Sequence, residues 1–88
     1  IEIAPGNADM YVDRGRARLA KGNVEAAIGD FDRAIRHDPN HANAHTQRAR
    51  AHEKLQQDAE ALADYEKAHE LGDTSEAVTA KLKAAGKL

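Results

Sequence analysis

The sequence has no cysteine and no tryptophan, and its 88 residues include only one phenylalanine, two tyrosines and two prolines. The absence of cysteine excludes disulfide bonds and thiol catalysis, and it leaves the redox compartment of the protein open. No apolar run reaches the roughly 20 residues that span a membrane. The net charge of -2 is too small to favour a nucleic acid or a membrane surface as partner. Because bulky side chains are scarce, a core has to come from close packing of helices.

One stretch, residues 26–39, carries the clearest helical pattern. Its apolar residues recur at i, i+1, i+4, i+7 and i+8, which places them on one stripe of an α-helix. Pro39 cannot continue that helix, and the residue before a proline favours extended geometry. The segment is therefore predicted to be an amphipathic helix that ends just before Pro39. The stripe consists of Ala27, Ile28, Phe31, Ala34 and Ile35.

The chain repeats itself at an offset of 34 residues, so that Ala8 falls on Ala42 and Arg14 on Arg48. Small residues meet small ones and an aromatic meets an aromatic at the same offset, which indicates stacked helical hairpins. Helices are predicted over residues 8–21, 23–37, 42–55, 58–71 and from 76 onward. Their expected N-caps are Asn7, Asn23, Asn40, Asp58 and, in a capping box with Glu76, Asp73.

Each repeat also keeps an arginine in its first helix and an aspartate in its second. The arginine positions are Arg14 and Arg48, and the aspartate positions are Asp30 and Asp64. We expect an ion pair inside each hairpin that fixes its register.

The repeat resembles the tetratricopeptide repeat, a helix-turn-helix unit. The matching positions are Gly15 and Ala49, Ala27 and Ala61, Phe31 and Tyr65, Ala34 and Ala68, Pro5 and Pro39. The sequence departs from the family at Arg18 and His52, where an aromatic is usual, and at Asp73, where the second repeat lacks its proline. The resemblance implies an all-α solenoid, a short right-handed superhelix of two hairpins plus a C-terminal capping helix. Its expected parts are a tail of a preceding helix or repeat (1–7), two repeats (8–41 and 42–75) and the cap (76–88).

The resemblance also implies a non-catalytic protein–protein interaction module, a scaffold or adaptor without a cofactor. In the family, the first helix of each repeat lines a concave groove that binds a peptide or helix of a partner. The corresponding residues here are Asp9, Val12, Asp13, Arg16, Asn43, Thr46, Gln47, Arg50, Lys54 and Lys81. Some relatives clamp the C-terminal carboxylate of a chaperone peptide. This chain has Val12, Arg16, Gln47, Ala77 and Lys81 at the clamp positions, and Lys81 alone is basic where the clamp requires it, so that clamp is not expected.

Carboxylates in the first repeat and basic groups in the second repeat and the cap would orient a partner with its acidic segment toward the C-terminal end. A rival interpretation is self-association into a homo-oligomer, because Ile1, Ile3 and Met10 would leave an apolar edge at the N-terminal end. A metal or enzymatic role is a remote alternative. The five histidines, His37, His41, His45, His52 and His69, lack cysteine partners and an HExxH motif.

Overall fold

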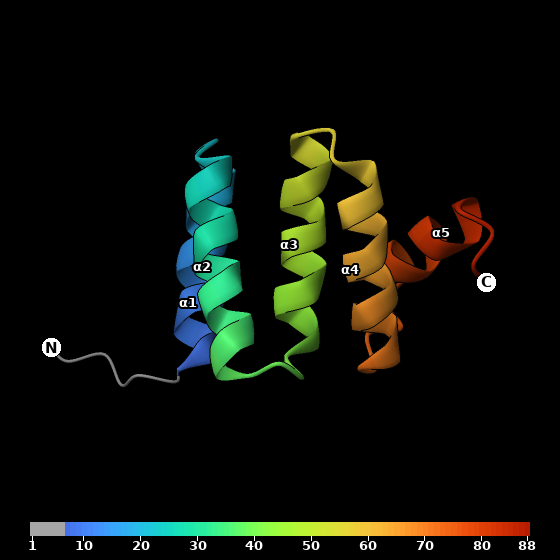
Figure 1. Cartoon of the computed structure of the whole chain (residues 1–88), viewed down its shortest axis with the longest axis horizontal. Coiled ribbons are helices and arrows are strands. Elements are labelled where there is room, and N and C mark those ends of the chain that lie inside the picture. Colours follow the sequence, from blue (N-terminus) through green and yellow to red (C-terminus); the bar gives the residue numbers. More distant parts are fainter. Residues whose placement is uncertain (1–6) are drawn as a thin grey trace, which may run out of the picture.

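The computed structural model describes residues 7–88, which form five α-helices and no strand (Figure 1). They are α1 (Ala8–Ala20), α2 (Val24–His37), α3 (Ala42–Lys54), α4 (Asp58–Glu70) and α5 (Glu76–Ala84). The first four agree with the predicted helices to within about a residue, and the all-α repeat fold is confirmed. The expected N-terminal edge at Ile1 and Ile3 lies outside the described residues, so self-association through it stays a prediction.

The helices pack as two antiparallel hairpins followed by a single helix. α1 packs against α2, α3 against α4, and α2 joins the two hairpins by packing against α3. α5 packs on α4 and runs at an angle to the other helices at the C-terminal end (Figure 1). This stacking leaves α1 and α3, the first helices of the two hairpins, next to each other.

The core relies on small side chains around a few larger ones. Phe31 of α2 is fully buried, and its ring lies so close to Gly15 of α1 that a Cβ there would stand 2.5 Å from Cε1. The second hairpin has Ala49 and Tyr65 at the equivalent positions, and both are buried. Gly15 therefore admits the Phe31 ring at the crossing of α1 and α2.

Both predicted ion pairs form, one inside each hairpin. Arg14 donates through Nε and Nη2 to the carboxylate of Asp30, with Nη2 2.8 Å from Oδ1. Arg48 makes the same two-pronged contact with Asp64, at 2.8 and 2.7 Å. Because a guanidinium and a carboxylate can pair in this way only when they are coplanar and aligned, each contact fixes the register of its hairpin.

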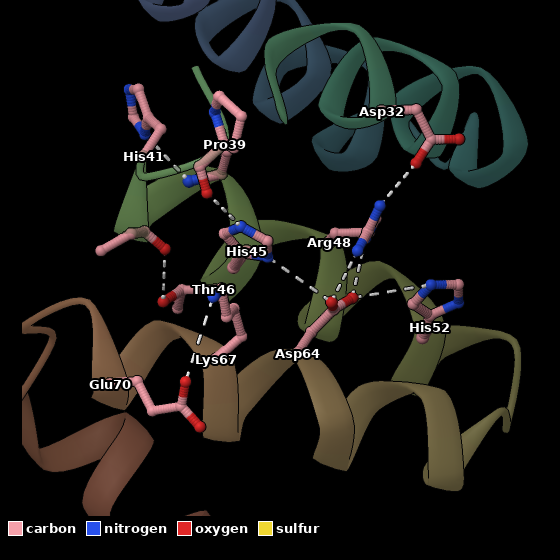
Figure 2. Close-up of polar contacts among 12 residues, drawn as sticks. Asp32, Pro39, His41, His45, Thr46, Arg48, His52, Asp64, Lys67 and Glu70 are labelled. Atoms are coloured by element: carbon pink, nitrogen blue, oxygen red, sulfur yellow. Dashed lines mark hydrogen bonds and ion pairs between the residues drawn. The ribbon is translucent and has the colours of Figure 1, made fainter. Parts of the chain in front are cut away.

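The two pairs differ in their further partners. Asp30 is fully buried and also accepts hydrogen bonds from Arg18 at 3.0 Å and Arg33 at 3.1 Å. Arg48 instead extends to the neighbouring hairpin, where its Nη1 donates to Asp32 of α2 at 2.9 Å (Figure 2). One arginine in the second repeat thus joins α2, α3 and α4.

The first N-cap is as predicted, since the side chain of Asn7 accepts a hydrogen bond from the Met10 N–H at 3.2 Å. The prediction for α3 is wrong by one residue. His41, and not Asn40, precedes that helix, and its Nδ1 accepts from the Ala44 N–H at 3.1 Å. Because Nδ1 is an acceptor, the proton of the neutral ring lies on Nε2.

The predicted caps of α4 and α5 are also wrong. Asp58 is the first residue of α4, and Gln57 occupies the cap position without a side-chain bond. Ser75 occupies the cap position of α5, again without a side-chain bond. Asp73 is not available as a cap, because its carboxylate accepts from the Thr46 hydroxyl at 2.6 Å and from the Ser75 N–H at 3.0 Å. It ties the α4–α5 loop to α3 instead.

The two hairpin turns share one backbone conformation but not one residue type. Gly22 ends the first helix of its hairpin with a φ of 89°, and Gln56 takes the equivalent place with a φ of 60°. The left-handed region costs a residue with a side chain roughly 1–2 kcal/mol. The second hairpin makes the same turn without a glycine, and the Gln57 N–H donates to the His52 carbonyl across it at 2.9 Å.

Candidate functional site

Two hollows lie along the first helices of the repeats. The first, which we call the α1–α3 cleft, has a volume of about 570 Å³. α1 contributes one wall and α3 the other. Its lining residues are Asp13, Arg16, Ala17, Leu19, Ala20, Gln47, Arg50 and Lys54.

The second hollow, the α3–α5 cleft, also has a volume of about 570 Å³. It is formed by α3, one residue of α4, the α4–α5 loop and α5. Gln47 and Arg50 line both clefts, so the two hollows meet on the surface of α3. The α3–α5 cleft is lined by Asn43, Thr46, Gln47, Arg50, Glu53, Tyr65, Asp73, Ser75, Ala77 and Lys81.

Most of the groove residues expected from the sequence line one of these clefts. Those in the α1–α3 cleft are Asp13, Arg16, Gln47, Arg50 and Lys54. Asn43, Thr46 and Lys81 line the α3–α5 cleft. Thr46 and Gln47 are nonetheless buried, at 6 % and 7 % exposed, so they form the floor and leave little surface for contact with a partner.

Two of the expected groove residues line neither cleft. Val12 is 3 % exposed and packs in the core, where a hydrophobic residue one turn from Ala8 has to lie. Asp9 is exposed, and its Oδ1 accepts from His41 Nε2 at 2.6 Å. It therefore joins α1 to the start of α3, a contact between repeats that the sequence did not suggest.

Sequence reasoning missed several lining residues. Ala17 and Ala20 lie on the same stripe of α1 as Asp13 and Arg16, at i+4 and i+7 from Asp13, so extending the helical period would have found them. Tyr65 could not be found in this way, because it lies on a second helix and extends past α3 into the α3–α5 cleft.

The charges of the α3–α5 cleft are largely paired. Lys81 of α5 places its Nζ 2.7 Å from Glu53 Oε2, and the Tyr65 hydroxyl donates to Glu53 Oε1 at 2.8 Å. Burial alone would raise the pKa of Glu53, but the hydrogen bonds from Lys81 and Tyr65 outweigh it and lower that pKa. Burial and the same carboxylate raise the pKa of Tyr65.

Asp73 at the mouth of the cleft behaves in the same way. Partial burial opposes ionisation, yet hydrogen bonds from Thr46 and Ser75 lower the pKa of its carboxyl group. Asp73 and Glu53 together connect α3 to the last loop and to α5. Both connections depend on the ionised carboxylate.

We expect acidification to loosen the contacts that hold α5 and the α4–α5 loop on α3. Because the folded-state pKa values of Glu53 and Asp73 are lowered, their stabilisation is present above the ordinary carboxyl pKa and is lost as the pH falls through the lowered values. Methyl NMR signals of Val78 and Leu82 should therefore shift over that range, and the ring signals of Phe31 report the first hairpin for comparison.

The matched variants are Glu53→Gln and Asp73→Asn, which should reduce the pH dependence of the α5 signals. If the Leu82 and Phe31 signals move together at every pH, the C-terminal end does not open separately.

Two histidines flank the ion pair of the second hairpin (Figure 2). His45 Nδ1 lies 3.7 Å from Asp64 Oδ1, and His52 Nε2 lies 3.7 Å from Asp64 Oδ2. Within residues 7–88, no three His, Cys, Asp or Glu side chains are grouped so as to hold a metal ion. In the same part of the chain, no helix has the length and apolar character needed to cross a membrane.

Comparison with known proteins places the chain in a family. Residues 12–76 match the family model described as tetratricopeptide repeat. Among solved structures, the chain is similar to the first tetratricopeptide repeat domain of Spaghetti (RPAP3), bound to the HSP90 peptide SRMEEVD. The TM-score is 0.85 at 25 % identity, over 94 % of this chain and 66 % of that one.

Curated relatives match over similar stretches. The SGT1 homolog of Oryza sativa subsp. japonica is 33 % identical over 57 residues, which is 65 % of this chain and 16 % of the relative. The mitochondrial import receptor subunit TOM70 of Homo sapiens is 43 % identical over 47 residues, 53 % of this chain and 8 % of the relative. The chain thus spans a small part of the length of these relatives. The helix pairs, the 34-residue offset and the family match together show that this chain belongs to the tetratricopeptide repeat family.

Proposed function

We propose that this chain is a non-catalytic peptide-binding module, in which one segment of a partner protein lies across the α1–α3 and α3–α5 clefts. The observation that carries the proposal is that the two clefts, each of about 570 Å³, share Gln47 and Arg50 in their linings and so lie side by side along α3. Pockets of several hundred cubic ångströms are the usual size of ligand sites in proteins. The similar domain of RPAP3, which binds the HSP90 peptide SRMEEVD, supports it.

The proposal is tested by blocking the groove without changing its charge. Ala17 is an exposed alanine of α1 that lines the α1–α3 cleft, and Ala77 is its counterpart in the α3–α5 cleft. We expect Ala17→Trp and Ala77→Trp each to weaken binding of peptides selected from a random display library, by at least about tenfold. Titration calorimetry gives the affinities, and circular dichroism establishes that each variant is folded.

Ala63→Trp is the matched control, because Ala63 is an exposed alanine of α4 that lines neither cleft. It should leave the affinity unchanged. Selected peptides that bind all three variants as tightly as the parent protein would place the binding surface elsewhere and refute the proposal.

A further inference from the structure

The two halves of the groove differ in how their charged groups are engaged. In the α3–α5 cleft, Lys81 already forms an ion pair with Glu53 at 2.7 Å. Asp73, a second carboxylate, lines the same cleft. The two cations of this cleft, Lys81 and Arg50, are balanced by two carboxylates, and an acidic side chain would have to displace Glu53 from Lys81, so this half of the groove offers an anion little net attraction.

The α1–α3 cleft has the opposite character. Arg16, Arg50 and Lys54 line it, all three side chains are exposed, and none forms an ion pair with another residue of the described chain. Asp13 is the one carboxylate among its lining residues. Arg50 also lines the α3–α5 cleft, and its charge contributes to the lowered pKa of Glu53, so Arg16 and Lys54 are the cations that belong to the α1–α3 cleft alone. This cleft therefore sets three cationic groups against one carboxylate.

We infer that the α1–α3 cleft binds the acidic side chains of the partner segment, while the α3–α5 cleft holds a neutral part of it. The inference rests on the proposed function and adds the chemistry of the ligand and its orientation. Arg16 and Arg50 can each pair with a carboxylate through two hydrogen bonds, and Lys54 adds a third positive charge. It differs from the expectation from the sequence, in which the acidic part points toward the C-terminal end, because Lys81 is already paired with Glu53.

The inference can be tested with an acidic peptide that binds weakly, provided that the method shows which residues of the protein it contacts. The probe is a synthetic peptide, Gly-Ser-Glu-Glu-Glu-Ser-Gly, with an amidated C-terminus so that carboxylate side chains are its only anions. In an amide NMR titration of the protein, we expect the shifts to concentrate at Ala17, Ala20 and Lys54 and to weaken with added salt. The same peptide with glutamine in place of glutamate should cause no shifts.

Charge-removing variants assign the effect to one cleft. Arg16→Gln and Lys54→Gln should each raise the dissociation constant of the acidic probe roughly two- to fivefold, as expected for an exposed charge pair. Lys81→Gln should change it by less than either. Arg36→Gln is the matched control for net charge, because Arg36 is exposed on α2 and lines neither cleft.

Several results would overturn the inference. Among them are a Lys81→Gln effect as large as that of Lys54→Gln, equal binding of the glutamine peptide, and the absence of binding by the acidic probe. If inorganic tripolyphosphate causes the same amide shifts as the acidic peptide, the cleft binds anions in general, and the inference that it recognises a peptide is wrong. None of these results contradicts the proposed function. That function is refuted only if the library-selected peptides bind the Ala17→Trp and Ala77→Trp variants as tightly as the parent protein.

Discussion

Arg48→Ala should lower the free energy of unfolding by about 3–5 kcal/mol, the usual cost of leaving a buried charge without its partner. The side chain of Asp64 is 8 % exposed, and Arg48 supplies both of its short hydrogen bonds. The same substitution also removes the contact to Asp32 that joins the two hairpins. A domain of this size has a total stability of roughly 4–13 kcal/mol, so we expect a large fall in the melting temperature.

Arg14→Ala should cost much less, about 1 kcal/mol, although it occupies the equivalent position. Its carboxylate partner, Asp30, keeps hydrogen bonds from Arg18 and Arg33 after the substitution, and the Arg14 side chain is 45 % exposed. Arg16→Ala, which removes no ion pair within the described chain, should be close to neutral. Chemical denaturation of the three variants gives the comparison directly, and equal losses for Arg48→Ala and Arg14→Ala would contradict it.

The two histidines beside Asp64 do not replace the Arg48 hydrogen bonds. His45 Nδ1 is buried without a hydrogen-bond partner and lies 3.7 Å from one carboxylate oxygen, and His52 Nε2 lies 3.7 Å from the other. Both distances are too long for a hydrogen bond, so Arg48 is the group whose loss leaves the carboxylate unpaired.

A double substitution separates the charge effect from lost packing. Arg48→Met with Asp64→Leu removes both charges of the pair and keeps apolar side chains in their place, so it should recover most of the stability lost in Arg48→Ala. If the double variant is as unstable as the single one, packing around the Arg48 stem accounts for the loss.

The helical architecture could be predicted because it depends on short-range spacing. The 34-residue offset aligned residues that occupy the same place in each hairpin, so Arg14 with Asp30 and Arg48 with Asp64 followed from one observation. Helix ends were accurate for the same reason. The N-cap residues were harder to predict. At the start of α3, both Asn40 and His41 have a side chain that can accept a hydrogen bond, and the structure has His41 in the cap position.

The departures from the family at Arg18 and His52 could be seen in the sequence but not explained from it. In the structure both side chains face the aspartate of their own hairpin: Arg18 Nη1 lies 3.0 Å from Asp30 Oδ2, and His52 Nε2 lies 3.7 Å from Asp64 Oδ2. A position that carries an aromatic in the family therefore carries a group of positive or titratable character here. Its role depends on a neighbouring helix, which the spacing within one helix cannot reveal.

The candidate groove was predictable as a face, but its charge was not. Asp13 and Arg16 of α1 and Gln47 and Arg50 of α3 were expected on this face from the resemblance to the family, and all four line the α1–α3 cleft. Whether a basic residue of that face is available depends on side chains from other elements. Lys81 forms an ion pair with Glu53. Arg50 lies one turn from Glu53 on α3 but forms no ion pair in the described chain.

Phe31→Ala should cost about 3–5 kcal/mol, the usual loss for truncating a buried aromatic side chain. Phe31 is fully buried, and its ring packs against α1 at Gly15. The substitution would leave a cavity between α1 and α2, where few other large side chains are available to fill it. Thermal unfolding followed by circular dichroism measures the loss.

The pairing of Phe31 with Gly15 gives the sharper test, because the effect of Gly15→Ala should change sign with the residue at position 31. In the parent protein the new Cβ would stand 2.5 Å from Phe31 Cε1, so overpacking of about 1–3 kcal/mol should exceed the gain of about 1 kcal/mol from replacing a helical glycine. In the Phe31→Ala background the clash is gone and Gly15→Ala should stabilise. Ala49→Gly, at the equivalent place in the second repeat, is the control and should destabilise by about 1 kcal/mol. If Gly15→Ala has the same effect in both backgrounds, the glycine is not there to admit the ring.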